Sequence, residues 1–594
     1  NMLKTWWQSF DKNPQQCWLI SILWLLLISW IAFFWNLGVM GVMDKTEALF
    51  VEVAHQVYLT DDWITPRWNW QTFFDYPIWG YWMVALSFKL FGVSEWAARL
   101  PVALAAIALV VLSFYTLRYF GLNGHEDQLE ARQRWIRAWI GTGIVALNPG
   151  WVGWGRTSVT DMFLSSAIAM AMLSFFLGYA QPENPKVQQR WYLAAPIFAA
   201  IAVLAKGPVG LLLPALAISI FLIYVGQFWQ VLREIKLITM IGIFLLITVP
   251  WYAAATQVNG AEFIGTFFGF SNFQRFTSVL YRHAGPWYFY LPYCFILLFP
   301  WSLFLPLAIA RLQFWRKKVW ASTPRNRQLG LFCFVWFMVI LVFFSAAATK
   351  LPGYILPIVP AGAIMITLLW GEEMLVDREK VYQQWPFLTS GIITTVLFFG
   401  LAIAAFISPQ LAGSDPAFPT FGATLEASGI PVIFGVILTA LGIFSAILLI
   451  KKNYRHWFWT SNLLFFISLL TVVVPPLAPI MDSQRQLPFR ELAKVVGQVA
   501  KPQELVFLMG YPRYSLVHYS QYRVEFLDDV NFAIDYLKDP TKVNPLPTVL
   551  IVTEPKFMDR FGLKPGDYQL IDEKGVYKLI RVAKSLLLEK QPQK

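Results

Sequence analysis

Charged residues are scarce in this 594-residue chain: Asp, Glu, Lys and Arg make up 14% of it, against about 25% in soluble domains. Cysteine is rarer still. Its three residues, Cys17, Cys294 and Cys333, lie in or beside apolar segments and show no metal-ligand spacing. Neither a soluble globular protein nor a disulfide framework is expected from this composition. We also find no internal repeat and no low-complexity segment.

Apolar and aromatic residues are correspondingly abundant. Hydrophobic residues make up 57% of the chain, with 50 Phe and 28 Trp, which is typical of lipid-facing surfaces and interfacial belts. Thirteen apolar runs have the length of a membrane crossing. They lie near 18–38, 98–118, 135–153, 158–180, 191–205, 208–226, 236–254, 287–310, 329–348, 352–371, 387–408, 430–450 and 456–476. We therefore predict an α-helical polytopic membrane protein with about 13 transmembrane helices.

The distribution of basic residues predicts the orientation. Residues 77–92 are short, amphipathic and carry Lys89, so we assign them to a surface or re-entrant helix. With the N-terminus in the cytoplasm, the inner connections then hold 21 Lys and Arg and the outer ones hold 9. The net charge of +12 reflects this bias better than it reflects nucleic-acid binding. We expect a multi-pass inner-membrane protein whose first span, after Lys4 and Lys12, is an uncleaved anchor.

The composition changes after the last apolar run. Residues 505–509 and 548–553 are typical of short buried strands, and residues 489–499 and 531–537 of helices. We predict a transmembrane domain over 1–476, in which 39–97 form an outer-face catalytic loop. A small soluble α/β domain over 477–594 is expected outside the membrane.

The unusual ionisable residues of the apolar part gather on the predicted outer face. They are Asp44, Glu47, Asp161, Lys206, Arg275, His283 and Lys350. Cations at a bilayer surface suit phosphate, and a nearby carboxylate suits a general base acting on a hydroxyl. Together they indicate a transferase that uses a lipid-linked phosphate donor.

Simpler interpretations stay open for each residue. Asp44 and Asp161 are candidate helix caps, and Lys206 and Lys350 are candidate snorkelling lysines. His283 is expected to be structural rather than catalytic. Glu47 and Glu52 are expected to be exposed positions on a surface helix.

Several motifs carry a resemblance to a known superfamily. They are Asp61-Asp62-Trp63-Ile64-Thr65-Pro66-Arg67, Phe74-Asp75-Tyr76-Pro77, residues 86–101, Arg156 with Asp161-Met162, Ala205-Lys206-Gly207-Pro208, Gln274-Arg275-Phe276, residues 286–292 with Phe299-Pro300-Trp301-Ser302, and residues 350–357. They occur in order within about residues 20–370. This part of the chain resembles the bacterial aminoarabinose transferase and protein O-mannosyltransferase superfamily.

The resemblance implies the GT-C fold and sugar transfer from a polyprenyl-phosphate donor at the outer leaflet, with inversion at the anomeric carbon. By position, Asp44 matches the first-loop catalytic acid, which would deprotonate or orient the acceptor hydroxyl, and Asp161 matches a second active-site acid. Arg275 matches a phosphate-contacting arginine, and Lys206 and Lys350 match cationic cavity positions. Further candidate substrate contacts are Glu47, Arg67, Asp75, His283 and Tyr354.

Three departures from the superfamily pattern bear on metal and sugar. Lys45 follows Asp44 where many relatives have Glu, and Tyr76 replaces a Lys that is associated with the lipid phosphate. Ser271-Asn272 replaces a Glu-His pair that is associated with a bound metal. We therefore predict no defined cofactor, leave a divalent cation open with Asp75 as a candidate ligand, and do not expect aminoarabinose as the sugar.

The leading hypothesis is an inverting membrane glycosyltransferase acting on an unidentified lipid, glycan or protein acceptor, with no nucleic-acid partner. The alternative is a flippase or transporter of lipid-linked sugars. That alternative predicts charges near the bilayer midplane and internal repeats, neither of which the sequence contains. A catalytically lost scaffold relative is a third hypothesis.

Overall fold

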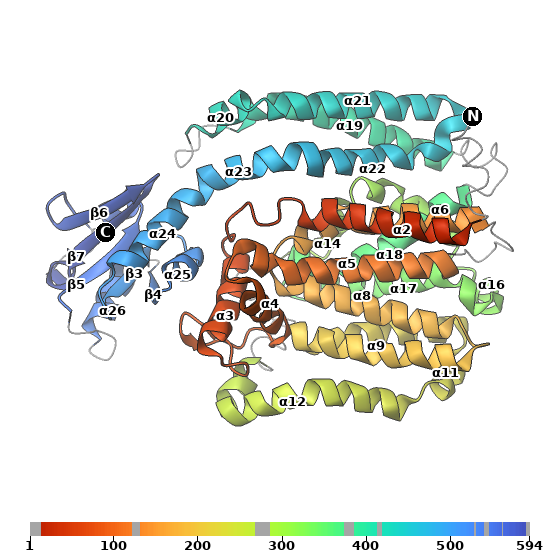
Figure 1. Cartoon of the computed structure of the whole chain (residues 1–594), viewed down its shortest axis with the longest axis horizontal. Helices are drawn as coiled ribbons and strands as arrows, with labels where there is room; N and C mark the ends of the chain where they lie inside the picture. Colours follow the sequence, from red (N-terminus) through yellow and green to blue (C-terminus); the bar gives the residue numbers. More distant parts are fainter. Residues whose placement is uncertain are drawn as a thin grey trace.

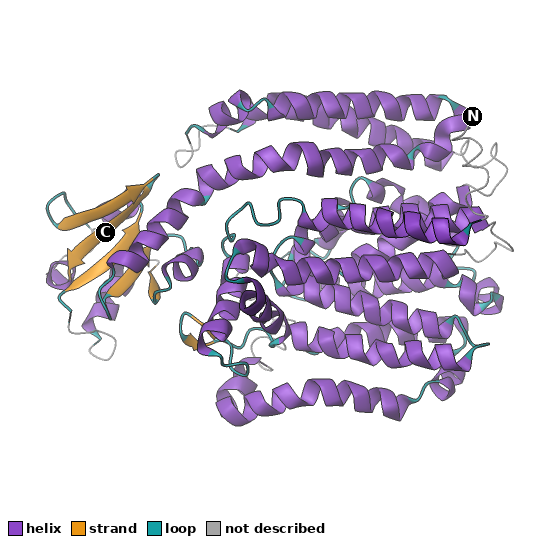
Figure 2. Ribbon diagram, viewed as in Figure 1, coloured by secondary structure: helices purple, strands orange, loops and turns teal. Residues whose placement is uncertain are grey.

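Long helices packed side by side make up most of the molecule, and a small sheet lies beyond one end of them (Figures 1 and 2). This computed structural model describes residues 13–121, 131–267, 285–373, 385–412, 419–527, 530–539, 546–560 and 562–589. The first helix, α2, begins at the end of the bundle far from the sheet (Figure 1).

The bundle is built from apolar helices that match the predicted spans in order. They are α2 Pro14–Ser29 with the π-helix η2 Trp30–Phe34, α5 Glu95–Phe120, α6 Ala131–Ala146, α8 Thr160–Tyr179, α9 Pro185–Lys206, α10 Val209–Val225, α12 Leu237–Ile264, α14 Tyr290–Leu297 with η4 Trp301–Phe304 and α15 Leu305–Leu312, α17 Leu329–Ala346, α18 Ile358–Glu373, α19 Trp385–Leu411, α21 Ile430–Ile450, and α22 Trp459–Ser468 with η8 Leu469–Val473 and α23 Val474–Arg485. Shorter helices connect them: α7 Pro149–Gly155, α11 Phe228–Glu234, α16 Lys317–Ser322, η5 Arg325–Arg327, η6 Pro352–Ile355, α20 Phe421–Ala427 and η7 Lys452–Trp457.

Among the described residues, eight helices are long and apolar enough to cross a membrane, by length and composition. A ninth crossing results if α14 and the η4–α15 segment, bent by 112°, count as one span. Helices such as α10 and α18 are apolar but shorter. The helical membrane fold is therefore confirmed, and the number of about thirteen crossings stays a prediction.

Local sequence explains where α7 and α9 begin. Asn148 precedes Pro149, and its side chain accepts a hydrogen bond from the Trp151 N–H at 2.8 Å. Asn184 precedes Pro185 in the same way and accepts from Val187. Asn at the N-cap with Pro at the first helical position is a strong helix start.

Residues 39–97, predicted to lie at the outer face and called the first outer loop below, fold as a compact layer across one end of the bundle. It contains α3 Thr46–Thr60, the two-residue strands β1 Arg67–Trp68 and β2 Gln71–Thr72, and α4 Trp79–Phe91. α4 covers the ambiguous segment 77–92 and is not among the spanning helices of the described chain. In Figure 1, α3 and α4 lie at the bundle end nearest the sheet.

The C-terminal region forms a five-stranded mixed sheet of order β4-β3-β5-β7-β6. β3 is parallel to both β4 and β5, and β7 pairs antiparallel with both β5 and β6. The elements are α24 Leu487–Val499, β3 Leu505–Met509, α25 Ser515–Ser520, β4 Val524–Leu527, α26 Val530–Lys538, β5 Thr548–Thr553, α27 Pro555–Arg560, β6 Tyr568–Lys574, β7 Tyr577–Ala583 and α28 Lys584–Glu589. The predicted strands 505–509 and 548–553 are confirmed.

Alternation along β3 divides this region into two apolar layers. Val506 and Leu508 pack in one cluster with α24 and α25, while Phe507 and Met509 pack in another with α26 and α28. Successive strand side chains point to opposite faces, so helices cover both sides of the sheet. Helix α23 spans the predicted domain boundary at 476/477, and the division into two domains stays a prediction.

Polar contacts join the sheet region to the first outer loop. The Asn69 side chain donates to the Val524 carbonyl at 2.7 Å and accepts from the Val524 N–H at 3.0 Å, which pairs the edge strand β4. Tyr519 on α25 donates to Glu95 at 2.9 Å and accepts from the Val42 N–H at 2.8 Å. α25 is therefore held directly against the loop that carries Asp44.

Candidate functional site

Asp161 and Lys206 form a half-buried ion pair at one end of the bundle. Asp161 lies in the first turn of α8, and Lys206 is the last residue of α9. Thr160 Oγ1 donates to the Ala205 carbonyl at 2.6 Å, which holds the two helix ends together. Val159, not Asp161, occupies the N-cap of α8. The structure therefore brings two predicted site residues together, and neither the cap nor the snorkelling interpretation describes them.

Aromatic rings surround this ion pair. The Lys206 Nζ lies 4.9 Å from the ring centroid of Tyr354 and 5.7 Å from that of Tyr76. A Cβ added at Gly353 would lie 3.2 Å from Asp161 Cγ and 3.1 Å from Trp154 Nε1. The backbone at Gly353 thus packs directly on the carboxylate. Ring faces near an ammonium stabilise it by cation–π attraction, so these side chains favour a cation at this point.

Lys350 supplies a second cation near this group. Its Nζ donates to the carbonyls of Ser345 at 2.8 Å and Ala347 at 2.6 Å, and lies 5.9 Å from the Tyr290 ring centroid. Lys350 lies three positions before Gly353, whose backbone packs on Asp161. Burial lowers the pKa of Lys350. Two of its three ammonium donors are used by these carbonyls.

Asp44 forms hydrogen bonds with the C-terminal region. Its Oδ1 accepts from the Ser515 N–H at 2.7 Å, and its Oδ2 accepts from the Ser515 hydroxyl at 2.6 Å. Burial raises the pKa of the Asp44 carboxyl above its ordinary value, and the hydrogen bonds from Ser515 oppose this shift. Asp44 does not cap α3, whose N-cap is Lys45.

Glu47 is a buried structural acid, so the expectation of an exposed residue is wrong. It is 2% exposed and pairs with Arg99 through two bonds of 2.8 Å. It also accepts from the backbone N–H groups of Ser158 at 2.9 Å and Met43 at 2.9 Å. These contacts hold α3, α5 and the segment before α8 together. A carboxylate in the interior is tolerated only when hydrogen bonds or an ion pair satisfy it, and Glu47 meets this condition.

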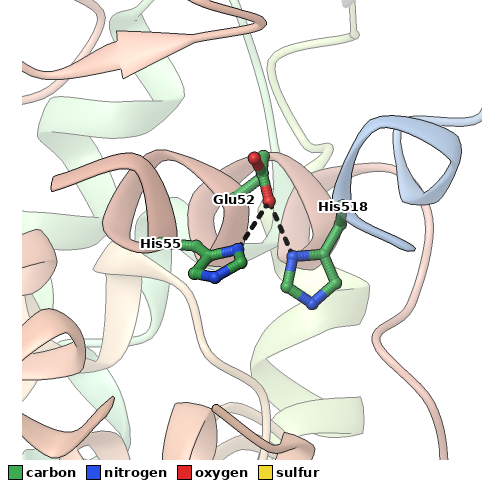
Figure 3. Close-up of side chains that lie close together, drawn as sticks. All are labelled: Glu52, His55 and His518. Carbon is green, nitrogen blue, oxygen red and sulfur yellow. Dashed lines mark hydrogen bonds and ion pairs between the residues drawn. The ribbon is translucent and has the colours of Figure 1, made fainter. Parts of the chain in front are cut away.

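Glu52 is also buried, again contrary to expectation, because α25 covers it. Its Oε2 lies 2.8 Å from His518 Nδ1 and 3.3 Å from His55 Nδ1, and both rings turn toward it (Figure 3). Burial acts to raise the pKa of Glu52, but the two histidines hold it at about 2. Among the described residues this is the one group of three side chains that could hold a metal ion.

The remaining predicted residues lie elsewhere. Arg67 pairs with Asp62 at 2.7 Å on the loop surface. Asp75 acts electrostatically on Tyr81 and is not part of the metal-capable group among the described residues. Arg275 and His283 lie outside the described residues.

Sequence reasoning missed His55, His518 and Ser515. His55 follows Glu52 by three positions, and this spacing on one helix face was the one local signal available. His518 and Ser515 lie in a region that the sequence separates from the outer loop by more than 400 residues, so no local pattern indicates their contact.

Comparison with known proteins supports the family interpretation. Residues 75–253 match the dolichyl-phosphate-mannose-protein mannosyltransferase family, and residues 499–594 match the C-terminal domain of cyanobacterial RgtA-type glycosyltransferases. The chain is 28% identical over 330 residues to an undecaprenyl phosphate-alpha-4-amino-4-deoxy-L-arabinose arabinosyl transferase of Shewanella sediminis, an alignment covering 56% of each chain. A protein of the same name from Pseudomonas paraeruginosa is 26% identical over 471 residues, covering 78% of this chain and 77% of the relative.

The fold also matches a solved structure. The crystal structure of ArnT from Cupriavidus metallidurans bound to undecaprenyl phosphate superimposes with a TM-score of 0.75 at 19% identity, covering 96% of this chain and 99% of that chain. The fold is therefore the GT-C fold, in a multi-pass inner-membrane protein. The predicted resemblance to the GT-C superfamily of polyprenyl-phosphate-sugar glycosyltransferases is confirmed.

Proposed function

We propose that the chain is an inverting glycosyltransferase that moves a sugar from a polyprenyl phosphate to an acceptor hydroxyl at the outer face of the membrane. The observation that carries this proposal is the Asp161–Lys206 pair with its aromatic walls and the nearby Lys350. It combines a carboxylate with two cations at one end of the bundle, which suits a reaction in which a phosphate is the leaving group. The relatives above are named as transferases of an undecaprenyl-phosphate-linked sugar, and such a donor agrees with this proposal.

In the proposed step the acceptor oxygen attacks the anomeric carbon while the bond between that carbon and the phosphate oxygen breaks. The acceptor proton passes to a carboxylate, for which Asp161 is the first candidate. Polyprenyl phosphate leaves with the bonding electrons, and Lys206 and Lys350 stabilise its growing negative charge. Preorganised cations in a water-poor site are effective because they need no reorganisation during the reaction.

Asp44 is the second candidate carboxylate. Both of its oxygens are bonded to Ser515, so its action on an acceptor depends on where α25 lies. This geometry favours Asp161 as the group nearer the reacting centre. Arg275 and His283 keep their proposed roles in phosphate and substrate contact, and Arg67, Asp75 and Tyr354 are proposed substrate contacts.

An apolar cavity between the helices is the proposed binding place for part of the lipid chain. It has a volume of about 310 Å³ and is lined by apolar side chains of α8, α9, α10, α11 and α12, including Ala171 and Phe175 of α8. Asp161 lies at the start of the same α8. A polyprenyl chain entering between these helices would keep its phosphate at the charged end.

Orientation is part of the proposal. The charge bias of the loops supports a cytoplasmic N-terminus and an extracytoplasmic C-terminal domain, and the site then faces outward. Alkaline phosphatase fused after residue 594 is expected to be active, because it folds only outside the cytoplasm.

The decisive experiment is transfer by the purified protein in liposomes. Undecaprenyl-phosphate-linked hexose, pentose and aminopentose would be supplied with total membrane lipid as acceptor. Release of undecaprenyl phosphate together with a new glycosylated product, read by mass spectrometry, supports the transferase. Movement of the intact donor across the bilayer without release would support the flippase instead.

A further inference from the structure

A second polar centre lies where α25 meets α3, and nothing in the transfer reaction accounts for it. Glu52 is fully buried, and His55 and His518 are 7% and 8% exposed. Their ligand-capable atoms all lie within 4.8 Å of one another. Glu52 and His55 share one face of α3 because they are three positions apart, and His518 comes from α25 (Figure 3).

Hydrogen bonding alone leaves a conflict in this cluster. Gln521 Nε2 lies 3.0 Å from His55 Nδ1 and 3.3 Å from Glu52 Oε2, and donates to the His518 carbonyl at 2.5 Å. A neutral imidazole nitrogen either donates or accepts. If His55 Nδ1 donates to Glu52, it cannot also accept from Gln521. Hydrogen bonds alone therefore cannot satisfy both contacts of His55 Nδ1, the one with Glu52 and the one with Gln521.

We propose that Glu52, His55 and His518 bind a divalent transition-metal ion, with zinc as the expected metal. Two imidazole nitrogens and one carboxylate oxygen form a ligand set that zinc uses, with a fourth position left for water or the Gln521 amide oxygen. A cation at the centre takes the lone pairs of both Nδ1 atoms and removes the donor conflict. The site clamps the C-terminal region onto the first outer loop.

The two distances from Glu52 to the histidines fit this assignment. Ligand atoms around a tetrahedral zinc with bonds of about 2.0–2.1 Å lie about 3.3 Å apart. Glu52 Oε2 lies 3.3 Å from His55 Nδ1 and 2.8 Å from His518 Nδ1. The Gln56 amide donates to the other carboxylate oxygen of Glu52 at 3.0 Å, which orients the carboxylate toward the histidines.

The competing explanation is a plain ion pair between Glu52 and a protonated histidine. It would stabilise the same interface without any metal. The two explanations differ in one measurable quantity, the amount of metal bound by the protein, and this quantity does not depend on the proposed transfer activity.

The test uses full-length protein purified in detergent with a tag that contains no histidine. After removal of metal by a chelator, zinc binding is measured by equilibrium dialysis and mass spectrometry. We expect about one zinc per chain. Glu52→Gln, His55→Ala and His518→Ala should each weaken binding at least as much as the roughly 10–100-fold that loss of an outer partner costs. His456→Ala is the matched control, because His456 lies on η7, away from the cluster, and it should bind zinc normally.

A second measurement keeps the proposal testable if the variants aggregate. In the unmodified protein, zinc should slow hydrogen exchange of the amides in α3 and α25, and cobalt should give an absorption spectrum of nitrogen and oxygen ligands. Binding of no zinc by the unmodified protein overturns the proposal. Equal loss of zinc in the control variant, or full retention in all three cluster variants, overturns it as well.

Discussion

Ser515 donates two hydrogen bonds to Asp44, one to each carboxylate oxygen, although the two residues are 471 positions apart. Asp44 thereby accepts from the first N–H of α25, and a carboxylate at this end of a helix is stabilised by the helix dipole. The acid that opens the first outer loop is therefore also an anchor for the C-terminal region. Its replacement tests both roles at once.

Asp44→Asn is expected to lower the free energy of unfolding by about 1–3 kcal/mol, because the acceptor of two half-buried hydrogen bonds is weakened. Transfer should fall less than in Asp161→Asn, since Ser515 engages both oxygens of Asp44. Ser515→Ala is the companion variant and should destabilise similarly. Loss of transfer in Asp44→Asn with unchanged thermal stability would place Asp44 at the reacting centre instead.

Asp161→Asn is expected to reduce the transfer rate by about 10²–10⁴-fold, the usual cost of losing a general base. Binding of undecaprenyl phosphate should persist in this variant, because both cations remain. Lys206→Met should weaken that binding. Lys89→Met serves as the control, because Lys89 is 59% exposed at its side chain and pairs only loosely with Asp61. Equal losses in the two lysine variants would argue against a role for Lys206 in phosphate binding.

Gly353→Ala should lower kcat while the protein remains folded. The added methyl group would lie 3.2 Å from Asp161 Cγ, so the carboxylate must shift by a few tenths of an ångström. Misplacement of a catalytic group by about 1 Å can cost about 100-fold in rate, and a smaller shift should cost less. Gly153→Ala is the matched control, because a Cβ there meets nothing within 4 Å. Comparable kcat values for the two variants would contradict the proposed position of Asp161.

Glu47→Gln should destabilise the protein strongly, by about 3–5 kcal/mol, because it leaves the buried Arg99 charge without its partner. The thermal unfolding temperature in detergent is the measurement. Glu573→Gln removes an exposed partner of Lys578, with the two groups 3.7 Å apart, and should cost less than about 1 kcal/mol. If both variants unfold at the same temperature, the Glu47–Arg99 pair does not stabilise the loop.

Phosphate binding is expected to weaken as the pH rises, and to do so before the pH reaches the ordinary pKa of a lysine. Burial lowers the pKa of Lys350, so its ammonium loses its proton at a lower pH than an exposed lysine does. The charge that holds phosphate is present below that lowered pKa and is lost as the pH rises through it. Affinity for undecaprenyl phosphate measured against pH should show this fall, and Lys350→Arg should remove it. An unchanged profile in Lys350→Arg would exclude Lys350 as the titrating group.

Much of the membrane part could be predicted because its signals are local. The apolar runs mark the helices, and the short connections after Arg156 and Ala205 place Asp161 and Lys206 at the same bundle end. The exposed positions predicted for Glu47 and Glu52 are wrong for one shared physical reason. A charged residue on a short amphipathic helix normally faces water, but here Arg99 and α25 cover α3 from two sides.

The amino-acid sequence by itself determined the membrane class, the helices and the acids and cations of the proposed site, because each of these follows from hydropathy and charge over short stretches. The tertiary structure alone decided that Asp44 binds Ser515 and that Glu52 and His55 meet His518. Those contacts join segments more than 460 residues apart, and only the docking of the sheet region on the first outer loop brings them within bonding distance.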